Sequence, residues 1–430
     1  MLGLKRRLSA LAKDGGQIRV GLIGAGQMGR GLISQIEAMV GMRVVVTADI
    51  FPENAKNAYL KARVAEAQIK ETNDLDEADK QIAAGCVVVT SNAMMVTRLQ
   101  NVDVIVDATG IPNIGAQIAW DAIMNKKHIV MLNVEADVTV GPLLKEMADA
   151  ADVVYTGSAG DEPGVIMELY DFADALGFEV VALGKGKNNP LNHQANPETA
   201  KAEAQAKGSS PKMLASFQDG TKTMVEMTAV ANATGFVPDI PGMHGPKATV
   251  NELPAMMTTK ENGGILNRTK IVEFVNGIAP GVFAIITSSM EEVHHEMKYL
   301  KMGDGPNYIL YRPYHLTSLE TPLSVARAFL DKEPSIAPYY GMVAETVAVA
   351  KKPLKAGEAL DTIGGFTAYG RIVTAEDKQK MNALPIGLIG PNIRLIRNVE
   401  QGEVITYDDV EFTETNMILQ LRQLMDLKAK

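Results

Sequence analysis

The chain has 430 residues, of which 46% are hydrophobic and 22% charged, with a formal net charge of −9 at pH 7. This composition is typical of a folded globular protein and excludes collagen-like or disordered chains, while the length predicts about two to four domains. The chain contains no run of about 18 apolar residues, so no transmembrane helix is predicted, and the negative net charge disfavours nucleic-acid binding. The single cysteine, Cys86, excludes an internal disulfide and a cysteine-based metal site. It begins an apolar run, so we expect a buried, unreactive thiol.

The N-terminal residues 1–13 interleave leucine with lysine and arginine. A secretory signal needs a continuous apolar segment after its basic residues, and none follows here. We therefore predict an amphipathic helix on the first domain of a cytoplasmic protein that binds neither membranes nor nucleic acid.

A short β-branched run at 18–23 is followed at once by Gly24-Ala-Gly-Gln-Met-Gly29 and then by a helical pattern at 30–39. A G-x-G-x-x-G motif between a strand and a helix predicts a dinucleotide-binding fold. The first glycine permits the tight turn, the second lets a pyrophosphate approach the backbone, and the third lets helix and strand pack closely. The helix N-terminus also favours phosphate. We expect cofactor contacts at Gly24, Ala25, Gly26, Gln27 and Met28.

The second predicted strand ends at Asp49, where a Rossmann fold places an acid that binds the ribose hydroxyls. An acid at this position repels a 2′-phosphate and favours NAD over NADP. Two alternatives stay open: Asp49 caps a helix, or Lys56, Lys61 and Arg63 bind a 2′-phosphate despite it.

Further strands are predicted at 86–92, 102–108, 128–133 and from 153, in a βαβ series that defines a nucleotide-binding domain over residues 1–157. Open α/β sheets bind ligands at the carboxyl edges of their strands. At these edges we expect further cofactor contacts from Ala108, Thr109, Gly110, Asn133 and Glu135.

Three later regions differ from the nucleotide-binding domain in their predicted secondary structure. Residues 158–341 mix strands and helices and predict an α/β substrate-binding and dimerisation domain, with a helix at 321–330 that returns to the nucleotide domain. Residues 342–412 predict a small β-rich domain, and 413–430 a closing helix. The apolar strands of the middle domain predict an intersubunit sheet, hence a homodimer or homotetramer.

The middle domain carries several polar candidates. Lys185 and Lys187 alternate at a strand end and precede two amides, Asn188 and Asn189, so they could hold one anion together or form a solvated loop. Asp161 and Glu162 start a helix; they either cap it or bind substrate hydroxyls or a divalent ion such as Mg or Mn. His244, Arg312 and His315 are further substrate-binding or acid–base candidates.

A metal site has no direct motif in the sequence. His294 and His295 are adjacent on a predicted helix, so their rings diverge and a shared metal is not expected.

The motifs GAGQMG, VIVDATG and LNVEADVTVG occur in the order found in the homoserine dehydrogenase superfamily, which this chain resembles. The tail segments PLKAGEAL and NVEQGEVITYDDV resemble a SAF domain, a small β-clip module. Together with GDEPG, DGTKTMVEM, GMHGP and GDGPNYILYRPYHL, they resemble the deoxyxylulose-phosphate-reductoisomerase-like (DRL) branch. The resemblance implies NADPH-dependent reduction and rearrangement of 1-deoxy-D-xylulose 5-phosphate in isoprenoid biosynthesis.

The resemblance also implies a catalytic lysine with a preceding acid, here Lys222 and Asp219, although their spacing is one residue shorter than in homoserine dehydrogenases. Burial near the nicotinamide would lower the pKa of a lysine, so that it could serve as an acid or base. The alternative for Lys222 is an ion pair with Glu226 at i,i+4. Lys185 and Lys187 replace the substrate loop of homoserine dehydrogenases, which argues against homoserine.

We therefore expect reduction of a carbonyl, with or without rearrangement, in a small phosphorylated or acidic sugar derivative. The proton would pass through Lys222. Two alternatives stay open: an alcohol dehydrogenase acting on a hydroxy or amino acid, and a non-catalytic sensor of dinucleotides.

Overall fold

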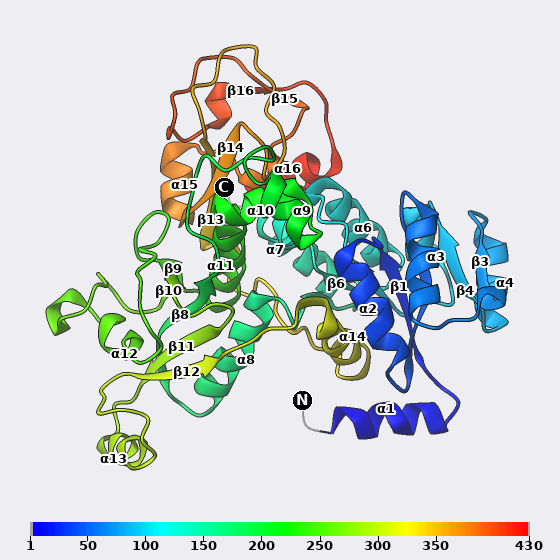
Figure 1. Cartoon of the computed structure of the whole chain (residues 1–430), viewed down its shortest axis with the longest axis horizontal. Helices are drawn as coiled ribbons and strands as arrows, with labels where there is room; N and C mark the ends of the chain where they lie inside the picture. Colours follow the sequence, from blue (N-terminus) through cyan, green and yellow to red (C-terminus); the bar gives the residue numbers. More distant parts are fainter. Residues whose placement is uncertain (1–2, 429–430) are drawn as a thin grey trace. The chain divides into compact units, whose positions relative to one another are not determined.

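The computed structural model describes residues 3–428, which divide into two compact units (Figure 1). Unit 1 comprises Met1–Gly164, Leu316–Ala337 and Leu421–Lys430. Unit 2 comprises Val165–His315 and Pro338–Gln420. The chain therefore passes more than once between the units.

Unit 1 is built on a parallel seven-stranded sheet in the order β3-β4-β2-β1-β5-β6-β7. Its strands are β1 (Ile18–Ile23), β2 (Met42–Ala48), β3 (Ile69–Glu71), β4 (Val87–Thr90), β5 (Val104–Asp107), β6 (His128–Met131) and β7 (Tyr155–Gly157). The central strands are runs of buried valine and isoleucine, as expected when helices cover both faces. This Rossmann-type α/β fold confirms the predicted fold class.

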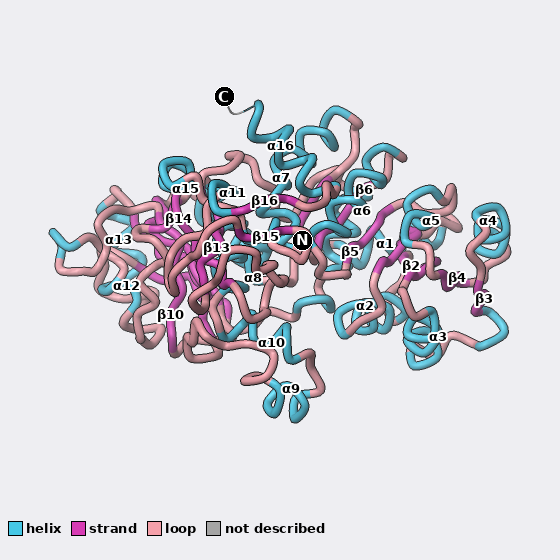
Figure 2. Tube along the Cα trace, turned by 90° about the horizontal axis from the view of Figure 1, so that it is seen from above, coloured by secondary structure: helices cyan, strands magenta, loops and turns pink. Residues whose placement is uncertain are grey.

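Helices flank this sheet on both sides (Figure 2). They are α1 (Leu4–Lys13), α2 (Gln27–Glu37), α3 (Pro52–Lys61), α4 (Leu75–Ala83), α5 (Ala93–Arg98), α6 (Pro112–Met124), α7 (Val134–Ala150) and α14 (Thr321–Leu330). Helix α1 buries Leu8 and carries Arg7, whose guanidinium lies 2.6 Å from the Asp331 carboxylate.

Two local features of unit 1 depart from the sequence pattern. The region 53–84, whose pattern is helical, contains the short strand β3, whose polar sequence Ile-Lys-Glu lacks the apolar alternation of a strand. Cys86 is half-buried rather than buried, because it precedes β4 instead of belonging to it.

Unit 2 contains a five-stranded mixed sheet in the order β12-β11-β8-β10-β9. The strands are β8 (Glu179–Lys187), β9 (Val237–Pro238), β10 (Ile271–Asn276), β11 (Val282–Thr287) and β12 (Tyr308–Arg312). The helices of this part are α8 (Glu162–Ala175), which starts in unit 1, α9 (Lys201–Lys207), α10 (Pro211–Gln218), α11 (Thr221–Thr234), α12 (Leu253–Met256) and α13 (Glu291–Tyr299). Apolar side chains of α8 and α11 pack on one face of the sheet, and residues 250–266 pack on the other.

The helical sequence pattern runs without a break from Phe217 to about Ala233, but α10 and α11 are separate helices. Gly220 interrupts them with a φ of +92°, a conformation that costs glycine little and other residues much. The Asp219 carboxylate closes the turn by accepting a 2.7 Å hydrogen bond from the Thr221 amide. This break sets the direction in which α11 and Lys222 leave the turn.

The C-terminal part of unit 2 is β-rich and packs against α11. It contains two antiparallel pairs, β13 (Ala344–Ala350) with β14 (Ala368–Thr374) and β15 (Ile393–Leu395) with β16 (Val410–Phe412), and the helix α15 (Ala375–Met381). The last helix is α16 (Met417–Lys428), and short 3₁₀ turns occur at Glu66–Gln68, Lys260–Asn262, Thr317–Leu319, Ile386–Leu388 and Tyr407–Asp409. Because β13, β14 and the β8 sheet all pack on α11, nearly every side chain of that helix is buried.

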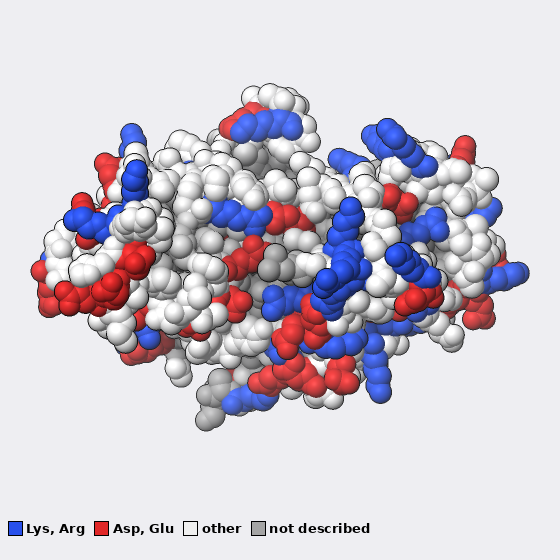
Figure 3. Space-filling model, turned by 90° about the horizontal axis from the view of Figure 1, so that it is seen from below, with Lys and Arg blue, Asp and Glu red and all other residues white. Residues whose placement is uncertain are grey.

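No helix within residues 3–428 has the length and apolar character that crossing a membrane requires. The face drawn in Figure 3 carries both basic and acidic side chains.

Asn232 provides a direct test of the packing between α11 and β13. Its side-chain oxygen accepts hydrogen bonds from the amides of Val343 (2.9 Å) and Ala344 (3.1 Å). Asn232→Leu should lower the free energy of unfolding by about 1–3 kcal/mol, because it leaves buried amides without an acceptor. Chemical denaturation measures the change, with Asn262→Leu on an exposed turn as the control. Equal stability of the two variants would show that Asn232 does not secure this contact.

Candidate functional site

The glycine loop of unit 1 has the geometry of a dinucleotide-binding turn. Gly24 has a φ of +103°, and a Cβ there would lie 2.7 Å from the Ala108 carbonyl oxygen. A Cβ at Gly29 would lie 2.0 Å from the Gly24 carbonyl oxygen, so α2 packs as closely as only glycine allows. Gly26 caps the N-terminus of α2, and a Cβ there would have no neighbour within 4 Å. The space that a pyrophosphate needs is therefore open before the helix.

Asp49 joins this loop to the next strand end. Its Oδ2 accepts a 2.8 Å hydrogen bond from the Ala25 amide, and its Oδ1 accepts bonds from the Phe51 amide (2.9 Å) and the Asn54 side chain (3.2 Å). Carboxylate oxygens keep further lone pairs for ribose hydroxyls. Ile50 and Phe51 beside it are 80% and 64% exposed, which offers apolar surface for a base.

The basic residues that could serve a 2′-phosphate are less directly placed. Lys56 lies 3.4 Å from the Glu66 carboxylate, whereas Lys61 and Arg63 are exposed. Asp49 therefore remains the charged group best placed to select the cofactor.

The edge formed by β5 and β6 is organised by a residue that the sequence analysis missed. Asp107 is fully buried and accepts hydrogen bonds from the Thr109 amide (2.9 Å) and hydroxyl (2.7 Å) and from the Asn133 side chain (3.1 Å). Burial raises the pKa of Asp107, opposed by these hydrogen bonds. Asn133 also caps α7 through the Ala136 amide. The sequence did offer a signal for Asp107, because this acid ends a predicted strand immediately before Ala-Thr-Gly.

The other cofactor candidates lie on the same segments. Ala108 and Thr109 are half-buried, Gly110 is exposed, and Glu135 is half-buried in the first turn of α7. Asn133 is wholly buried and uses its side chain within the protein, so it positions this edge rather than offering its amide to a ligand.

The segment with Asp161 and Glu162 lies between two glycines that the packing requires. A Cβ at Gly160 would lie 2.1 Å from the Thr317 carbonyl oxygen, and one at Gly164 would lie 2.2 Å from that of Ser158. Helix α8 begins at Glu162, and Asp161, immediately before it, is half-buried. Both acids thus stand at a helix N-terminus, as predicted for either a cap or a ligand group.

In unit 2, β8 and α11 bring charged groups together beneath the surface. Lys185 is 4% exposed and forms a buried ion pair with Glu226, which is 1% exposed. Lys187 is 7% exposed, and its ammonium donates a 2.7 Å hydrogen bond to the Phe217 carbonyl oxygen. Burial and the charge of Lys185 lower the pKa of Lys187 to about 8, against the opposing effect of Asp219 and Glu226.

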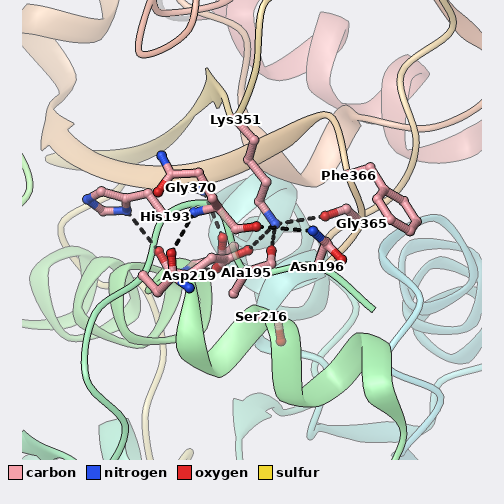
Figure 4. Close-up of polar contacts among 12 residues, drawn as sticks. His193, Ala195, Asn196, Ser216, Asp219, Lys351, Gly365, Phe366 and Gly370 are labelled. Atoms are coloured by element: carbon pink, nitrogen blue, oxygen red, sulfur yellow. Dashed lines mark hydrogen bonds and ion pairs between the residues drawn. The ribbon is translucent and has the colours of Figure 1, made fainter. Parts of the chain in front are cut away.

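Asp219 pairs with a lysine other than Lys222. Its Oδ2 lies 2.7 Å from the ammonium of Lys351, a buried residue that the sequence analysis did not single out (Figure 4). Burial raises the pKa of Asp219, and the charge of Lys351 opposes that rise. The acid expected to steady Lys222 is thus engaged by Lys351 and by the α11 turn. Lys222 itself is half-buried in the first turn of α11.

His193 is a second residue that the sequence analysis missed. Its Nδ1 lies 3.0 Å from the Asp219 carbonyl oxygen, and its ring stacks on Tyr369 with centroids 4.2 Å apart. A carbonyl only accepts hydrogen bonds, so Nδ1 carries the hydrogen and Nε2 keeps the lone pair in the neutral ring. No motif marked His193, because its partners come from distant segments.

His244 lies on the other face of the sheet. Its Nδ1 lies 2.9 Å from Glu273 and its Nε2 3.4 Å from Asp239, two buried carboxylates. Bonding to Glu273 raises the pKa of His244. Phe274, not Glu273, pairs with Lys185, so Glu273 points away from the lysines. The structure therefore does not bring His244 together with Lys185.

The remaining candidates are dispersed. Arg312 lies 3.0 Å from Glu168 and stacks on Tyr314, and His315 is half-buried just beyond it. Asn188 is exposed and Asn189 half-buried after β8. His294 contacts the Tyr308 hydroxyl, whereas His295 faces Glu292, so the two rings diverge as expected.

Comparison with known proteins supports the assignment of both regions. Residues 24–156 match the homoserine dehydrogenase NAD-binding domain, and residues 160–321 match the catalytic domain of the oxidoreductase DRL. The protein is an NAD(P)-dependent oxidoreductase. The nicotinamide cofactor class and the superfamily resemblance are thereby supported, whereas neither match extends to the tail that resembled a SAF domain.

Similar solved structures include a probable dehydrogenase from Thermotoga maritima, with 13% identity over 74% of this chain and 90% of that chain and a TM-score of 0.42. Levoglucosan dehydrogenase in complex with NADH and L-sorbose shows 19% identity over 42% of this chain and 45% of that chain, with a TM-score of 0.28. A 3-ketoreductase from Actinomadura kijaniata with NADP shows 16% identity over 44% and 55%, with a TM-score of 0.29. At these scores the similarity carries no argument about substrate. A search of curated proteins finds no match.

Gly26 offers a sharp test of the cofactor site. Gly26→Val should fold like the native protein, because its φ of −67° suits any residue and its Cβ meets open space. The added side chain fills the pyrophosphate position, so the affinity for NADH should fall about 100-fold or more. Calorimetric titration with NADH measures the loss, and Ala83→Val on an exposed helix position of the same unit is the control. Undiminished NADH binding by a folded Gly26→Val variant would place the cofactor elsewhere.

Proposed function

We propose that the protein uses NAD(P)H to reduce a carbonyl in a small phosphorylated or acidic sugar derivative, with or without a skeletal rearrangement. The match of residues 160–321 to the catalytic domain of DRL supports this reaction class. A substrate related to 1-deoxy-D-xylulose 5-phosphate is the most specific form of the proposal. The observation that carries it is the electrostatic state of Lys187.

The three buried lysines around β8 differ in their partners. Lys185 is compensated by Glu226 and Lys351 by Asp219, whereas Lys187 contacts a neutral carbonyl. An ammonium has three N–H donors, and Lys187 has no second acceptor among residues 3–428. A buried cation without an ion-pair partner is costly, and a bound anion lowers that cost. Phosphate or carboxylate therefore fits this position better than a neutral sugar.

Each other group has a proposed part. The nicotinamide, bound along the glycine loop and Asp49, supplies hydride. Lys222 exchanges the proton at the substrate oxygen, because it is a half-buried lysine in the first turn of α11. Asp161 and Glu162 hold substrate hydroxyls, directly or through Mg or Mn, and loss of turnover with EDTA tests the metal.

A hydroxy acid would satisfy Lys187 as well as a sugar phosphate does. A cofactor-oxidation screen of sugar phosphates, sugar acids and uncharged sugars, each with and without Mg, separates the substrates. We expect turnover only with the anionic compounds. Faster turnover of an uncharged sugar than of every anionic one would overturn the proposal. We further propose a homodimer or homotetramer in the cytoplasm; monomers in sedimentation at micromolar concentration would argue against the oligomer.

Lys187 should impose a distinct pH dependence. A lysine with a pKa of about 8 is charged below pH 8 and neutral above it, so kcat/KM for an anionic substrate should fall as the pH rises through about 8. Lys187→Met should raise KM about 10–100-fold, remove this ionisation and leave NADH affinity unchanged. Lys201→Met, on an exposed helix position of the same unit, is the control. A profile without an ionisation between pH 7 and 9, together with an unaltered KM in Lys187→Met, would refute the role.

Cofactor choice should depend on Asp49. Asp49→Ser should shift the ratio of kcat/KM values towards NADPH by about tenfold or more, because it removes the charge that repels a 2′-phosphate. Glu53→Ser removes the same charge from an exposed site four residues along and should leave the ratio unchanged. If both variants keep the native preference, another group selects the cofactor.

A further inference from the structure

Lys351 joins three separate segments of unit 2 through one buried ammonium. It follows β13 directly and is 3% exposed. Its Nζ lies 2.7 Å from Asp219 Oδ2 and donates hydrogen bonds to the carbonyl oxygens of Ala195 (2.6 Å) and Gly365 (2.8 Å) (Figure 4). The three oxygens belong to the loop after β8, the turn between α10 and α11, and the C-terminal β-rich part.

Two partners are carbonyl oxygens that accept hydrogen bonds, and the third is the Asp219 carboxylate, whose charge compensates that of the ammonium. Breaking one contact exposes a charge to an apolar interior, which is costly when the group is this buried. The three segments consequently hold their relative positions together rather than independently.

Two of the three segments, the loop after β8 and the turn between α10 and α11, carry or adjoin candidate substrate residues. The loop of residues 188–196 contains Asn188, Asn189 and His193, and it is tied to the end of α10 by the Asn192 amide, which donates to the Gln218 carbonyl oxygen at 2.8 Å. His193 contacts the Asp219 carbonyl oxygen at 3.0 Å. The turn at Asp219 leads directly into α11 and Lys222.

A second contact from the C-terminal part acts on the same turn. The Gly370 amide of β14 donates a 2.8 Å hydrogen bond to the Thr221 hydroxyl, the first residue of α11. The start of α11 is thus fixed from β13 through Lys351 and from β14 through Gly370.

We propose that Lys351 is a positioning residue for the substrate site, and that the C-terminal β-rich part is therefore a working part of that site. Lys351 acts through its partners and does not touch the substrate. It fixes the loop 188–196 against the first turn of α11, so that the loop amides and Lys222 keep a constant relation to Lys187. This inference rests on the proposed function for its kinetic consequences, but not for its structural ones.

The test uses the full chain with the variants Lys351→Met, Lys351→Arg and the double variant Lys351→Met/Asp219→Asn. The double variant removes the carboxylate that a single substitution would leave buried and unpaired, so it keeps the fold if the single variant does not. Lys352→Met, at the exposed neighbouring lysine, is the matched control.

The first readout is hydrogen exchange followed by mass spectrometry, which requires no substrate. Peptides covering 188–196 and 219–226 should exchange about tenfold faster or more in the double variant, with the sheet strands unchanged. The second readout is kinetic: kcat should fall about 10–100-fold with an unchanged KM for NADH, and Lys351→Arg should restore part of kcat. Lys352→Met should match the native protein in both.

Unchanged exchange in both peptides would overturn the inference, as would native kcat in a folded double variant. Faster exchange throughout unit 2 would also overturn it, because it would show that Lys351 supports the whole fold rather than this site. If the native protein turns over no anionic substrate, the proposed function fails, and the exchange data still decide the position of the loop.

Discussion

Unit 2 buries three ammonium groups near β8, and the partners that these groups require constrain the structure around them. A buried cation is stabilised by an ion pair, and without one burial lowers its pKa. Lys185 and Lys351 each meet a carboxylate, Glu226 and Asp219, whereas Lys187 meets only the Phe217 carbonyl, and its pKa falls to about 8. The ammonium that the fold leaves without an ion pair is the one that an anionic substrate would pair with under the proposed function.

Unit 1 meets a different constraint, because its site is made of backbone. Gly24 and Gly29 are fixed by contacts with Ala108 and with each other, while Gly26 faces open space. The loop is therefore tightly packed at Gly24 and Gly29 and open at Gly26, where a pyrophosphate would lie. Asp49 adds a side chain that holds the loop through the Ala25 amide and keeps lone pairs for a ribose. A Rossmann fold thus builds a phosphate site largely without side chains, and the sequence pattern reveals it clearly.

The site of unit 1 is formed by adjacent residues and that of unit 2 by distant ones, and this difference explains which parts of each site could be predicted from the sequence. The strands, the glycine loop and Asp49 follow from local patterns, because adjacent residues create the turn and the strand end. The break at Gly220 was missed because the apolar pattern continues across it. Lys351 and His193 were missed because their partners lie far away in the chain: Lys351 is 132 residues from Asp219, and His193 meets Tyr369 across 176 residues. Asp219 was singled out from the resemblance, but its partner is Lys351, a pairing that no spacing could indicate.

The proposed function depends most on the charge state of Lys187, which can be measured directly. Nuclear magnetic resonance of the lysine side chains, assigned by comparison with Lys187→Met, would give its pKa in the protein and again with an anionic substrate analogue bound. We expect a pKa of about 8 in the free protein, rising towards the ordinary lysine value when the anion binds, because the anion stabilises the charged form. An ordinary lysine pKa in the free protein, unchanged by the anion, would contradict the proposed function.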